Sequence, residues 1–131
     1  MSQENVDLVT GGYDDFNSGN IPAVTARFHS DIEWNEPGGG NAPAGTFRGP
    51  DSVANDVFAT VPQNFDDFSC TVEQASDQGD TVVVRARFKG RSKSGAELDT
   101  GAEHVWQVRE GKIARFENKI DNTDNWASAW S

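Results

Sequence analysis

Apolar residues recur at helical spacing at the start of the chain. Val6, Val9, Tyr13 and Phe16 lie three or four positions apart, which places them on one face of an amphipathic helix. The segment Asn17-Ser18-Gly19-Asn20 follows directly, and its glycine can take the left-handed conformation that commonly ends a helix. The pattern therefore predicts a first helix that carries one apolar stripe and ends at this segment.

A second helix is expected directly after the first. Asn20 is a suitable N-cap, and Pro22 is tolerated in the first turn, where its missing N–H would have no intrahelical partner. We expect this helix to stop near His29-Ser30-Asp31. Its apolar stripe would consist of Ile21, Val24 and Phe28.

The next segment changes from a short strand to a loop and then to a third helix. Residues 32–35 are a strand candidate, and the Gly- and Pro-rich stretch from Glu36 through Gly49 is typical of a loop. Pro50-Asp51-Ser52 opens the third helix. Its apolar residues are Val53, Val57, Phe58 and Val61.

From Phe65 onward apolar and polar residues alternate, a period typical of strands. Turns are expected over 76–80 and 90–95. Helices first and an antiparallel meander afterwards predict an α+β architecture, in which the helices cover one face of a curved sheet. The expected strands of the meander span 65–75, 81–89, 103–109 and 112–122.

The last two expected strands are joined by a tight turn at Glu110-Gly111, where glycine supplies the positive φ that a short hairpin needs. The buried face of the returning strand is left open, because its apolar markers Ile113, Phe116 and Ile120 do not share one parity. A β-bulge would reconcile them, and the sequence does not fix its position.

Composition favours one compact domain spanning residues 1–131, since a chain of 131 residues with 35% hydrophobic content suits one modest core. No stretch approaches the roughly 20 consecutive apolar residues of a membrane span. The polar start, residues 1–5, lacks the basic and then apolar pattern of a signal peptide. A cytoplasmic protein without a membrane partner is therefore expected.

The balance of charge narrows the choice of partners. A net charge of −10, from 21 acidic against 11 basic side chains, would repel nucleic acid and anionic lipid headgroups. The acidic residues are spread along the chain, as in a solvated acidic surface. Such a surface also suits high intracellular salt, so a halophilic source is a hypothesis.

Several kinds of site are disfavoured. Cys70 is the only cysteine, so we expect a buried inert thiol and no disulfide. His29 and His104 lie far apart without a supporting metal motif, which argues against a metal site. Gly38-Gly39-Gly40 is followed by no lysine and does not match a phosphate-binding loop. We expect neither a metal nor a cofactor.

Candidate chemistry lies around the last hairpin. His104 and Trp106 precede the turn and Asp121 follows it, so an imidazole and a carboxylate beside an indole wall are predicted to face one pocket and transfer protons. Simpler interpretations stay open: His104 as a core histidine bonded to a backbone carbonyl, and Asp121 as the cap of a C-terminal turn. The segment from Trp126 to Trp130 is interpreted as a lid or a dimer contact.

These motifs, taken in order, resemble the SnoaL-like proteins of the nuclear-transport-factor-2-like superfamily, to which ketosteroid isomerase also belongs. The resemblance covers nearly the whole chain. It implies a cone-shaped fold, with three N-terminal helices packed on a curved, mostly antiparallel sheet that encloses a pocket, and a homodimer formed through the sheet. The segments that carry it are Tyr13 to Asn20, Asp31 to Trp34, Glu36-Pro37-Gly38, Gly45 to Pro50, and His104 to Ile113.

The resemblance also implies roles for single residues. Glu36 is similar in position to the general base of ketosteroid isomerase, and His104 to the acid that donates to the oxyanion. The isomerase tyrosine aligns with Gly12, beside Tyr13. In the SnoaL-like polyketide cyclases an aspartate on the last strand is the base beside a histidine, a pair that Asp121 and His104 resemble.

The function expected from this resemblance is removal of a proton α to a carbonyl in a small apolar compound, by an isomerase or cyclase that needs no cofactor. Asp121 or Glu36 would be the base and His104 the donor or shuttle. The alternative is a non-catalytic ligand-binding or protein-association module of the same fold. Whether the protein is an enzyme stays open at this point. Side chains expected to bind the substrate are Trp34, Trp106, Tyr13, Phe16, Phe58 and Phe116.

Overall fold

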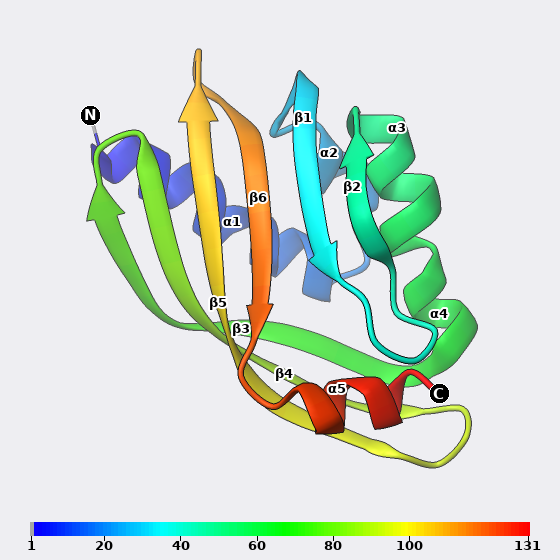
Figure 1. Cartoon of the computed structure of the whole chain (residues 1–131). Coiled ribbons are helices and arrows are strands. Elements are labelled where there is room, and N and C mark those ends of the chain that lie inside the picture. The colour runs from blue at the N-terminus through cyan, green and yellow to red at the C-terminus, as the bar shows by residue number, and fades with distance from the viewer. Residues whose placement is uncertain (1) are drawn as a thin grey trace.

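A single curved sheet is the scaffold on which all other elements pack (Figure 1). The computed structural model describes residues 2–131. Six strands follow the order β2-β1-β6-β5-β4-β3, and every neighbouring pair is antiparallel except β1 and β6, which are parallel. The strands are β1 (Phe28–Pro37), β2 (Ala44–Arg48), β3 (Phe65–Gln78), β4 (Thr81–Ser92), β5 (Glu97–Arg109) and β6 (Lys112–Ile120).

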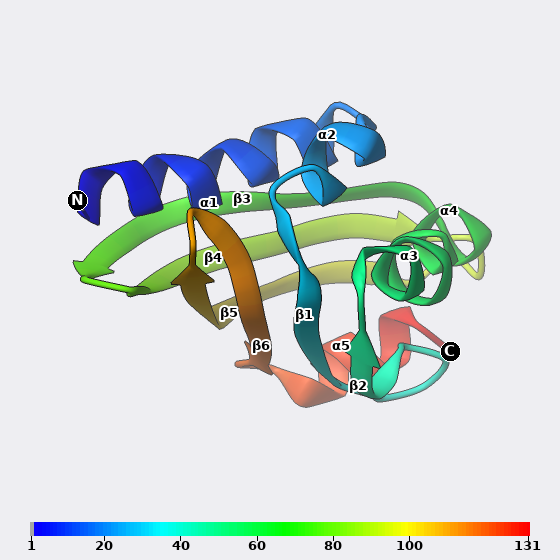
Figure 2. The same cartoon turned by 90° about the horizontal axis from the view of Figure 1, so that it is seen from above.

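The long helix lies across the concave side of this sheet, and the shorter ones close its ends (Figures 1 and 2). The segment from α3 to α4 is continuous and contains a π-helical turn, η1, while α5 follows β6 at the C-terminus. The α+β class, the helices on one face and the mostly antiparallel sheet are confirmed. The helices are α1 (Ser2–Asn17), α2 (Ile21–Thr25), α3 (Pro50–Val53), η1 (Ala54–Phe58), α4 (Thr60–Asn64) and α5 (Thr123–Ala129).

The second helix is shorter than expected, and the prediction that it reaches residues 29–31 is wrong. It ends at Thr25, and Phe28 is the first residue of β1. Phe28 pairs with Ile113 of β6, and the backbone carbonyl of Arg27 accepts a hydrogen bond from Ile113 N. Pairing with β6 therefore competes with the helix for this stretch of backbone and overrides the apolar stripe.

The Gly- and Pro-rich segment after Glu36 contains a strand that the pattern did not predict. β2 pairs with β1 in antiparallel register, with Trp34 opposite Phe47. It lies at the edge of the sheet and most of its residues are exposed, so it shows no alternation of apolar and polar residues. β3, β4 and β5 also run further than predicted, and the turn between β4 and β5 is correspondingly shorter.

A bulge in β6 resolves the parity of the returning strand. Val108 of β5 pairs with Ile113, whereas the preceding Gln107 pairs with Arg115, so Ala114 is the extra residue. Beyond the bulge, the even-numbered residues face the helices: Phe116 and Asn118 are buried, while Lys119 is exposed. One extra residue thus decides which side chains of β6 reach the interior.

Candidate active site

A cavity of about 90 Å³ lies between the concave face of the sheet and the helices. Its wall is almost entirely apolar, and the polar side chains that reach it include Arg27, which lies between α2 and β1, and residues of α1 and of strands β1, β5 and β6. This volume is below the roughly 150 Å³ of an apolar cavity that holds one benzene molecule, so a one-ring ligand is the upper limit of size and requires the side chains of the wall to move outward. All six residues expected to bind the substrate line it: Tyr13, Phe16, Trp34, Phe58, Trp106 and Phe116.

A chain of hydrogen bonds crosses the wall of the cavity. Trp106 Nε1 donates to the hydroxyl oxygen of Tyr13 over 2.9 Å, and this hydroxyl lies 2.6 Å from His104 Nδ1. On the other side of the ring, His104 Nε2 lies 3.1 Å from Asn118 Oδ1. Asn118 Nδ2 then donates to Glu36 Oε1 over 3.0 Å. The predicted donor and the predicted base are therefore linked through one asparagine.

The strand register explains why these groups meet. His104 and Asn118 are direct cross-strand partners in the β5–β6 pair, so their side chains emerge side by side. In β1, Trp34 and Glu36 share the parity of Ile32 and therefore face the same side of the sheet. Tyr13 reaches the group from α1, and its ring stacks on His104 with centroids 5.8 Å apart.

The direction of each hydrogen bond follows from which atoms can donate. Trp106 Nε1 can only donate, so Tyr13 accepts from it and directs its own hydrogen to His104 Nδ1. The imidazole hydrogen is then on Nε2 and faces the Asn118 carbonyl. Because the oxygen of the Asn118 amide faces His104, its nitrogen faces Glu36 and donates to the carboxylate. The network therefore fixes His104 as the neutral Nε2–H tautomer.

Glu36 is held at both carboxylate oxygens. Trp34 Nε1 donates to Oε2 over 2.6 Å, while Asn118 donates to Oε1. Burial against the apolar wall raises the pKa of Glu36 to about 7, and the two hydrogen bonds offset only part of that rise. A carboxyl group whose pKa lies near neutrality suits a general base.

His104 and Tyr13 stay neutral beside this carboxylate. His104 is only 2% exposed, and burial lowers its pKa to about 3 although the Asn118 hydrogen bond acts in the opposite direction. Burial also raises the pKa of Tyr13 well above its usual range. Cys70 lines the same cavity and its thiol stays protonated, because burial raises its pKa. Glu36 is therefore the group in this wall that titrates near neutrality.

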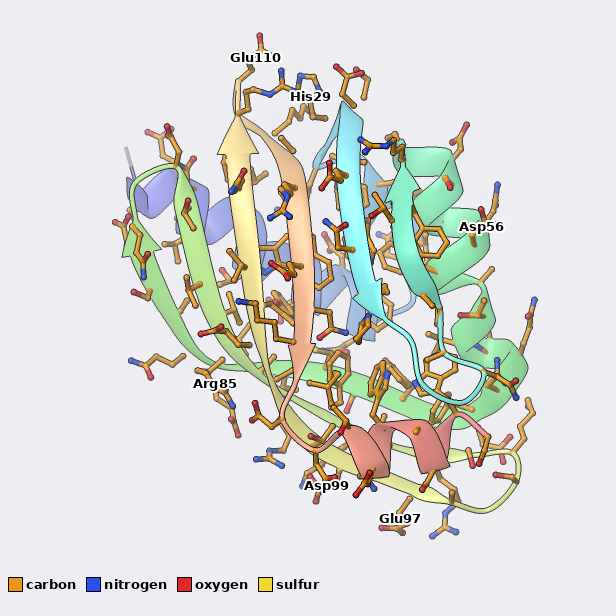
Figure 3. The ribbon with its side chains drawn as sticks, in the orientation of Figure 1. His29, Asp56, Arg85, Glu97, Asp99 and Glu110 are labelled. Atoms are coloured by element: carbon orange, nitrogen blue, oxygen red, sulfur yellow. The ribbon has the colours of Figure 1, made fainter. Side chains whose placement is uncertain are left out.

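Asp121 does not join the cavity, so its predicted convergence with His104 is wrong. Its carboxylate pairs with Arg85 and is 47% exposed on the outer face of the sheet. Arg85 projects from that outer face, away from the helices, in Figure 3. Asp121 continues the parity of the exposed Lys119, not that of the buried Asn118, and this parity directs it outward.

Asn118 is the site residue that the sequence analysis missed. It shares the parity of Phe116 and Ile120, which were recognised as apolar markers of β6, and it is 5% exposed. An amide at a buried position of a strand needs hydrogen-bond partners, which is the signal that would have identified it. Its partners are the two candidate catalytic groups, His104 and Glu36.

No cluster of three or more potential metal ligands exists among residues 2–131. Within the same residues, no helix has the length and apolar character needed to cross a membrane.

Comparison with known proteins identifies the family. The sequence profile of the SnoaL-like domain matches residues 9–116. The chain belongs to the SnoaL-like domain family. No curated protein matches the sequence.

Solved structures agree with this assignment and show that the SnoaL-like domain has the nuclear-transport-factor-2-like fold. A nuclear transport factor 2-like protein from Burkholderia thailandensis is 29% identical, with 95% of each chain covered and a TM-score of 0.86. TerC, co-crystallised with polyporic acid, is 25% identical, with 98% of this chain and 99% of TerC covered and a TM-score of 0.86. Bal32a, from a soil-derived mobile gene cassette, is 22% identical, with 99% and 98% covered and a TM-score of 0.90.

The C-terminal helix closes one end of the cavity of this SnoaL-like domain. Trp126 and Trp130 are 3% and 2% exposed and both line the cavity, so the interpretation that they are exposed dimer contacts is wrong. The backbone carbonyl of Trp130 accepts a hydrogen bond from Asn41 N, which connects the helix to the loop between β1 and β2. The helix packs against β5, and Phe88 of β4 contacts Trp126 with ring centroids 4.9 Å apart.

Proposed function

We propose that this SnoaL-like domain is a cofactor-independent enzyme of the isomerase or cyclase type, which removes a proton from the carbon next to a carbonyl group in a small apolar compound. Glu36 is the base. The observation that carries the proposal is its carboxylate, which lies in an apolar wall, is held at both oxygens and has its pKa raised to about 7. A base whose pKa lies near the working pH transfers protons most efficiently.

Tyr13 stabilises the enolate that this step creates. When Glu36 takes the proton, the electron pair of the C–H bond moves into the enolate and negative charge develops on the carbonyl oxygen. The Tyr13 hydrogen, which points at His104 in the free protein, turns to this oxygen because an oxyanion is a stronger acceptor than an imidazole whose pKa is about 3. The Trp106 hydrogen bond to the same hydroxyl supports the shift.

His104 and Asn118 act as positioning residues in this scheme. The neutral His104 ring holds the Tyr13 hydroxyl, and Asn118 holds both the ring and the carboxylate. Neutral partners are required here, because a charged imidazolium would lower the pKa of Glu36 and weaken it as a base. The ionised carboxylate in turn accepts from both Asn118 and Trp34.

Hydrogen–deuterium exchange at the α-carbon of small ketones tests the proposal. Cyclohexanone and similar one-ring ketones are incubated in deuterated buffer and followed by ¹H NMR. The protein should accelerate exchange, and Glu36→Gln should reduce the acceleration by about 100-fold or more. Glu33→Gln is the matched control, because Glu33 lies on the same strand but pairs with Arg115 and Arg48 away from the cavity.

Two results would overturn the proposal. Exchange that persists in Glu36→Gln would remove Glu36 as the base. Tight binding of the ketones without any exchange would favour the alternative, a non-catalytic binding module. The polyporic acid complex of TerC supports an organic ligand in this fold without deciding between the two.

We also propose that the protein is a homodimer formed through the sheet, as the resemblance implies. The outer face of β3, β4 and β5 carries side chains of both charges, since Arg87 of β4 pairs there with Glu73 of β3 and Asp99 of β5. Sedimentation equilibrium over a range of protein and salt concentrations distinguishes a dimer from a monomer. A cytoplasmic location remains a prediction, and so does the adaptation to high salt that the net charge of −10 suggests.

A further inference from the structure

We propose that the indole N–H groups of Trp126 and Trp130 form a second polar subsite of the cavity, which binds a neutral oxygen of the ligand. The inference rests on the proposed function for the ligand's other end and extends it to a substrate class. That class is a compact neutral compound with two oxygen groups: a carbonyl that activates the α-carbon at Glu36, and a second oxygen that accepts from the indole N–H groups of Trp126 and Trp130.

The observation behind the subsite is a contrast among the four tryptophans of the chain. Trp34 donates to Glu36 and Trp106 donates to Tyr13. Trp126 Nε1 and Trp130 Nε1 are buried and have no hydrogen-bond partner among the described residues. A buried donor without a partner destabilises the fold. Because both residues line the cavity, we infer that an acceptor for these donors arrives with the ligand, after a small movement of the rings that now cover the N–H groups.

Both indoles are held in place before any ligand binds. Their ring centroids lie 5.7 Å apart, and Trp130 packs on Phe65 at 4.9 Å. Asn122 caps α5 by accepting from Asn125 N over 3.0 Å, while the Asn125 side chain donates to the carbonyl of Glu97 over 2.9 Å. The helix is thus fixed at its first turn to β5, so the two donors keep their orientation.

The charges around the cavity decide which acceptor fits. Arg27 is the one cationic side chain in the described lining, and it is engaged by Asp15 over 2.9 Å and by the carbonyl of Leu8 over 2.9 Å. A ligand carboxylate would therefore be buried without a counter-charge and in the same cavity as Glu36, which is unfavourable. The carbonyl, ether or hydroxyl oxygen of a neutral ligand carries no such penalty and accepts from an indole N–H.

A matched pair of ligands tests the subsite by isothermal titration calorimetry. Cyclohexane-1,4-dione and cyclohexanone have nearly the same size, but only the dione presents a second oxygen across the ring. The wild-type protein should bind the dione about 3- to 10-fold more tightly, as expected for one net hydrogen bond. The preference should fall to about 1 when Trp126→Phe and Trp130→Phe are combined, because phenylalanine keeps a ring and removes the donor.

The cyclohexanone affinity is the control for structural damage, since a distorted cavity would weaken both ligands equally. In addition, ¹H–¹⁵N spectra of the wild-type protein should show the Trp126 and Trp130 indole signals moving when the dione, but not cyclohexanone, is added. Equal affinities in the wild type, absence of binding by both compounds, or a preference that survives the double substitution would each overturn the subsite.

This outcome is separable from that of the proposed function. Binding requires no turnover, so Glu36→Gln should keep the preference for the dione while it loses α-proton exchange. A protein that catalyses exchange but shows no dione preference would overturn the subsite and leave the base assignment standing. A protein that prefers the dione but does not catalyse exchange would overturn the base assignment and leave the subsite standing.

Discussion

Asn118 Nδ2 donates to Glu36 Oε1 over 3.0 Å, and so joins two parallel strands, β6 and β1, inside the cavity. The hydrogen bond favours the ionised carboxylate, whereas burial favours the protonated one, and burial is the larger effect because the pKa of Glu36 rises to about 7. Asn118 also accepts a hydrogen bond from His104, whose pKa is lowered to about 3. Two titrating groups with opposite shifts therefore share one amide.

The shift of Glu36 predicts a pH dependence of folding stability. Its pKa is higher in the folded protein, about 7, than in the unfolded chain, near 4.5, so the folded state binds more protons between these values. Its contribution is fully present below about pH 4.5 and is lost as the pH rises to about 7. Glu36→Gln should therefore be more stable than wild type at pH 8, by about 1–2 kcal/mol given that Glu36 keeps some exposed surface.

Urea unfolding at pH 5 and pH 8 measures this difference. The gain from Glu36→Gln should be present at pH 8 and shrink at pH 5, where the wild-type carboxyl is already protonated in the folded state. An equal effect of the substitution at both pH values would contradict the raised pKa. Glu33→Gln serves as the control, since Glu33 is paired with Arg115 and its pKa is lowered instead.

The shifted pKa of His104 predicts that folding stability falls as the pH is lowered, which is the opposite of the Glu36 effect. Its pKa is lower in the folded protein, about 3, than in the unfolded chain, about 6.5, so the unfolded chain binds the extra proton in this window. The stability that the neutral ring supports is lost as the pH falls from 6.5 towards 3. His104→Gln, which keeps a donor and an acceptor but does not titrate here, should flatten the acid limb below about pH 4.5, where Glu36 adds no slope, by about 2 kcal/mol.

Circular dichroism followed through acid titration is the measurement for His104. Between about pH 4.5 and 6.5 the slopes from Glu36 and His104 have opposite signs and partly cancel in the wild type. The single variants should therefore show steeper dependence in that window than the wild type, in opposite directions. Parallel curves for the two variants would disprove the assignment of these shifts.

Much of the site was predictable from the sequence, and its exceptions have local causes. Tyr13 and Phe16 follow a helical stripe, so their inward orientation could be predicted without knowledge of the tertiary structure. Glu36 was expected in a loop, but it lies in β1 and shares the parity of Ile32 and Trp34. The resemblance aligned Gly12, not Tyr13, with the isomerase tyrosine, and it is the Tyr13 hydroxyl that reaches His104.

The exceptions concern pairing between distant segments. A bulge at Ala114 depends on the register of β5 against β6, which apolar spacing within one strand does not reveal. The strand β2 forms because β1 offers it a partner, and the second helix ends early because Phe28 pairs with Ile113. Asn118 is a polar residue within the apolar parity of Phe116 and Ile120, so the spacing of apolar residues does not identify it. In each case a tertiary contact overrides a local pattern.

Removal of the Asn118 amide should raise the pKa of Glu36 further. Asn118→Leu keeps a similar volume but leaves Glu36 Oε1 without its donor, so the neutral carboxyl is favoured. The midpoint of Glu36 titration, followed by ¹³C NMR of the labelled carboxyl, should move upward by about one pH unit. A parallel shift should appear in the pH profile of α-proton exchange. An unchanged or lowered midpoint would show that the hydrogen bond does not influence the base.

The Tyr13 hydroxyl should matter for both stability and catalysis. Tyr13→Phe leaves Trp106 Nε1 and His104 Nδ1 without their partner in a buried site, which should cost about 1–3 kcal/mol. The α-proton exchange rate should fall with little change in ketone affinity, because the hydroxyl acts mainly on the enolate. Phe16→Leu, in the same helix and cavity wall, is the control: it should alter affinity more than the maximal rate. A maximal rate retained by Tyr13→Phe would exclude Tyr13 as the donor.

A substitution at Asp121 should have no effect on catalysis. The family resemblance suggested Asp121 as a base, but its position outside the cavity argues against that role. Its carboxylate is 47% exposed and pairs with Arg85 on the outer face of the sheet, opposite the cavity. Asp121→Asn should leave α-proton exchange and ketone binding unchanged and should alter stability by less than about 1 kcal/mol, as is usual for an exposed ion pair. Exchange rates of Asp121→Asn and Glu36→Gln, measured side by side at pH 8, separate the two carboxylates directly. A loss of exchange in Asp121→Asn alone would restore the cyclase-like assignment and require the sheet to present its outer face to the substrate.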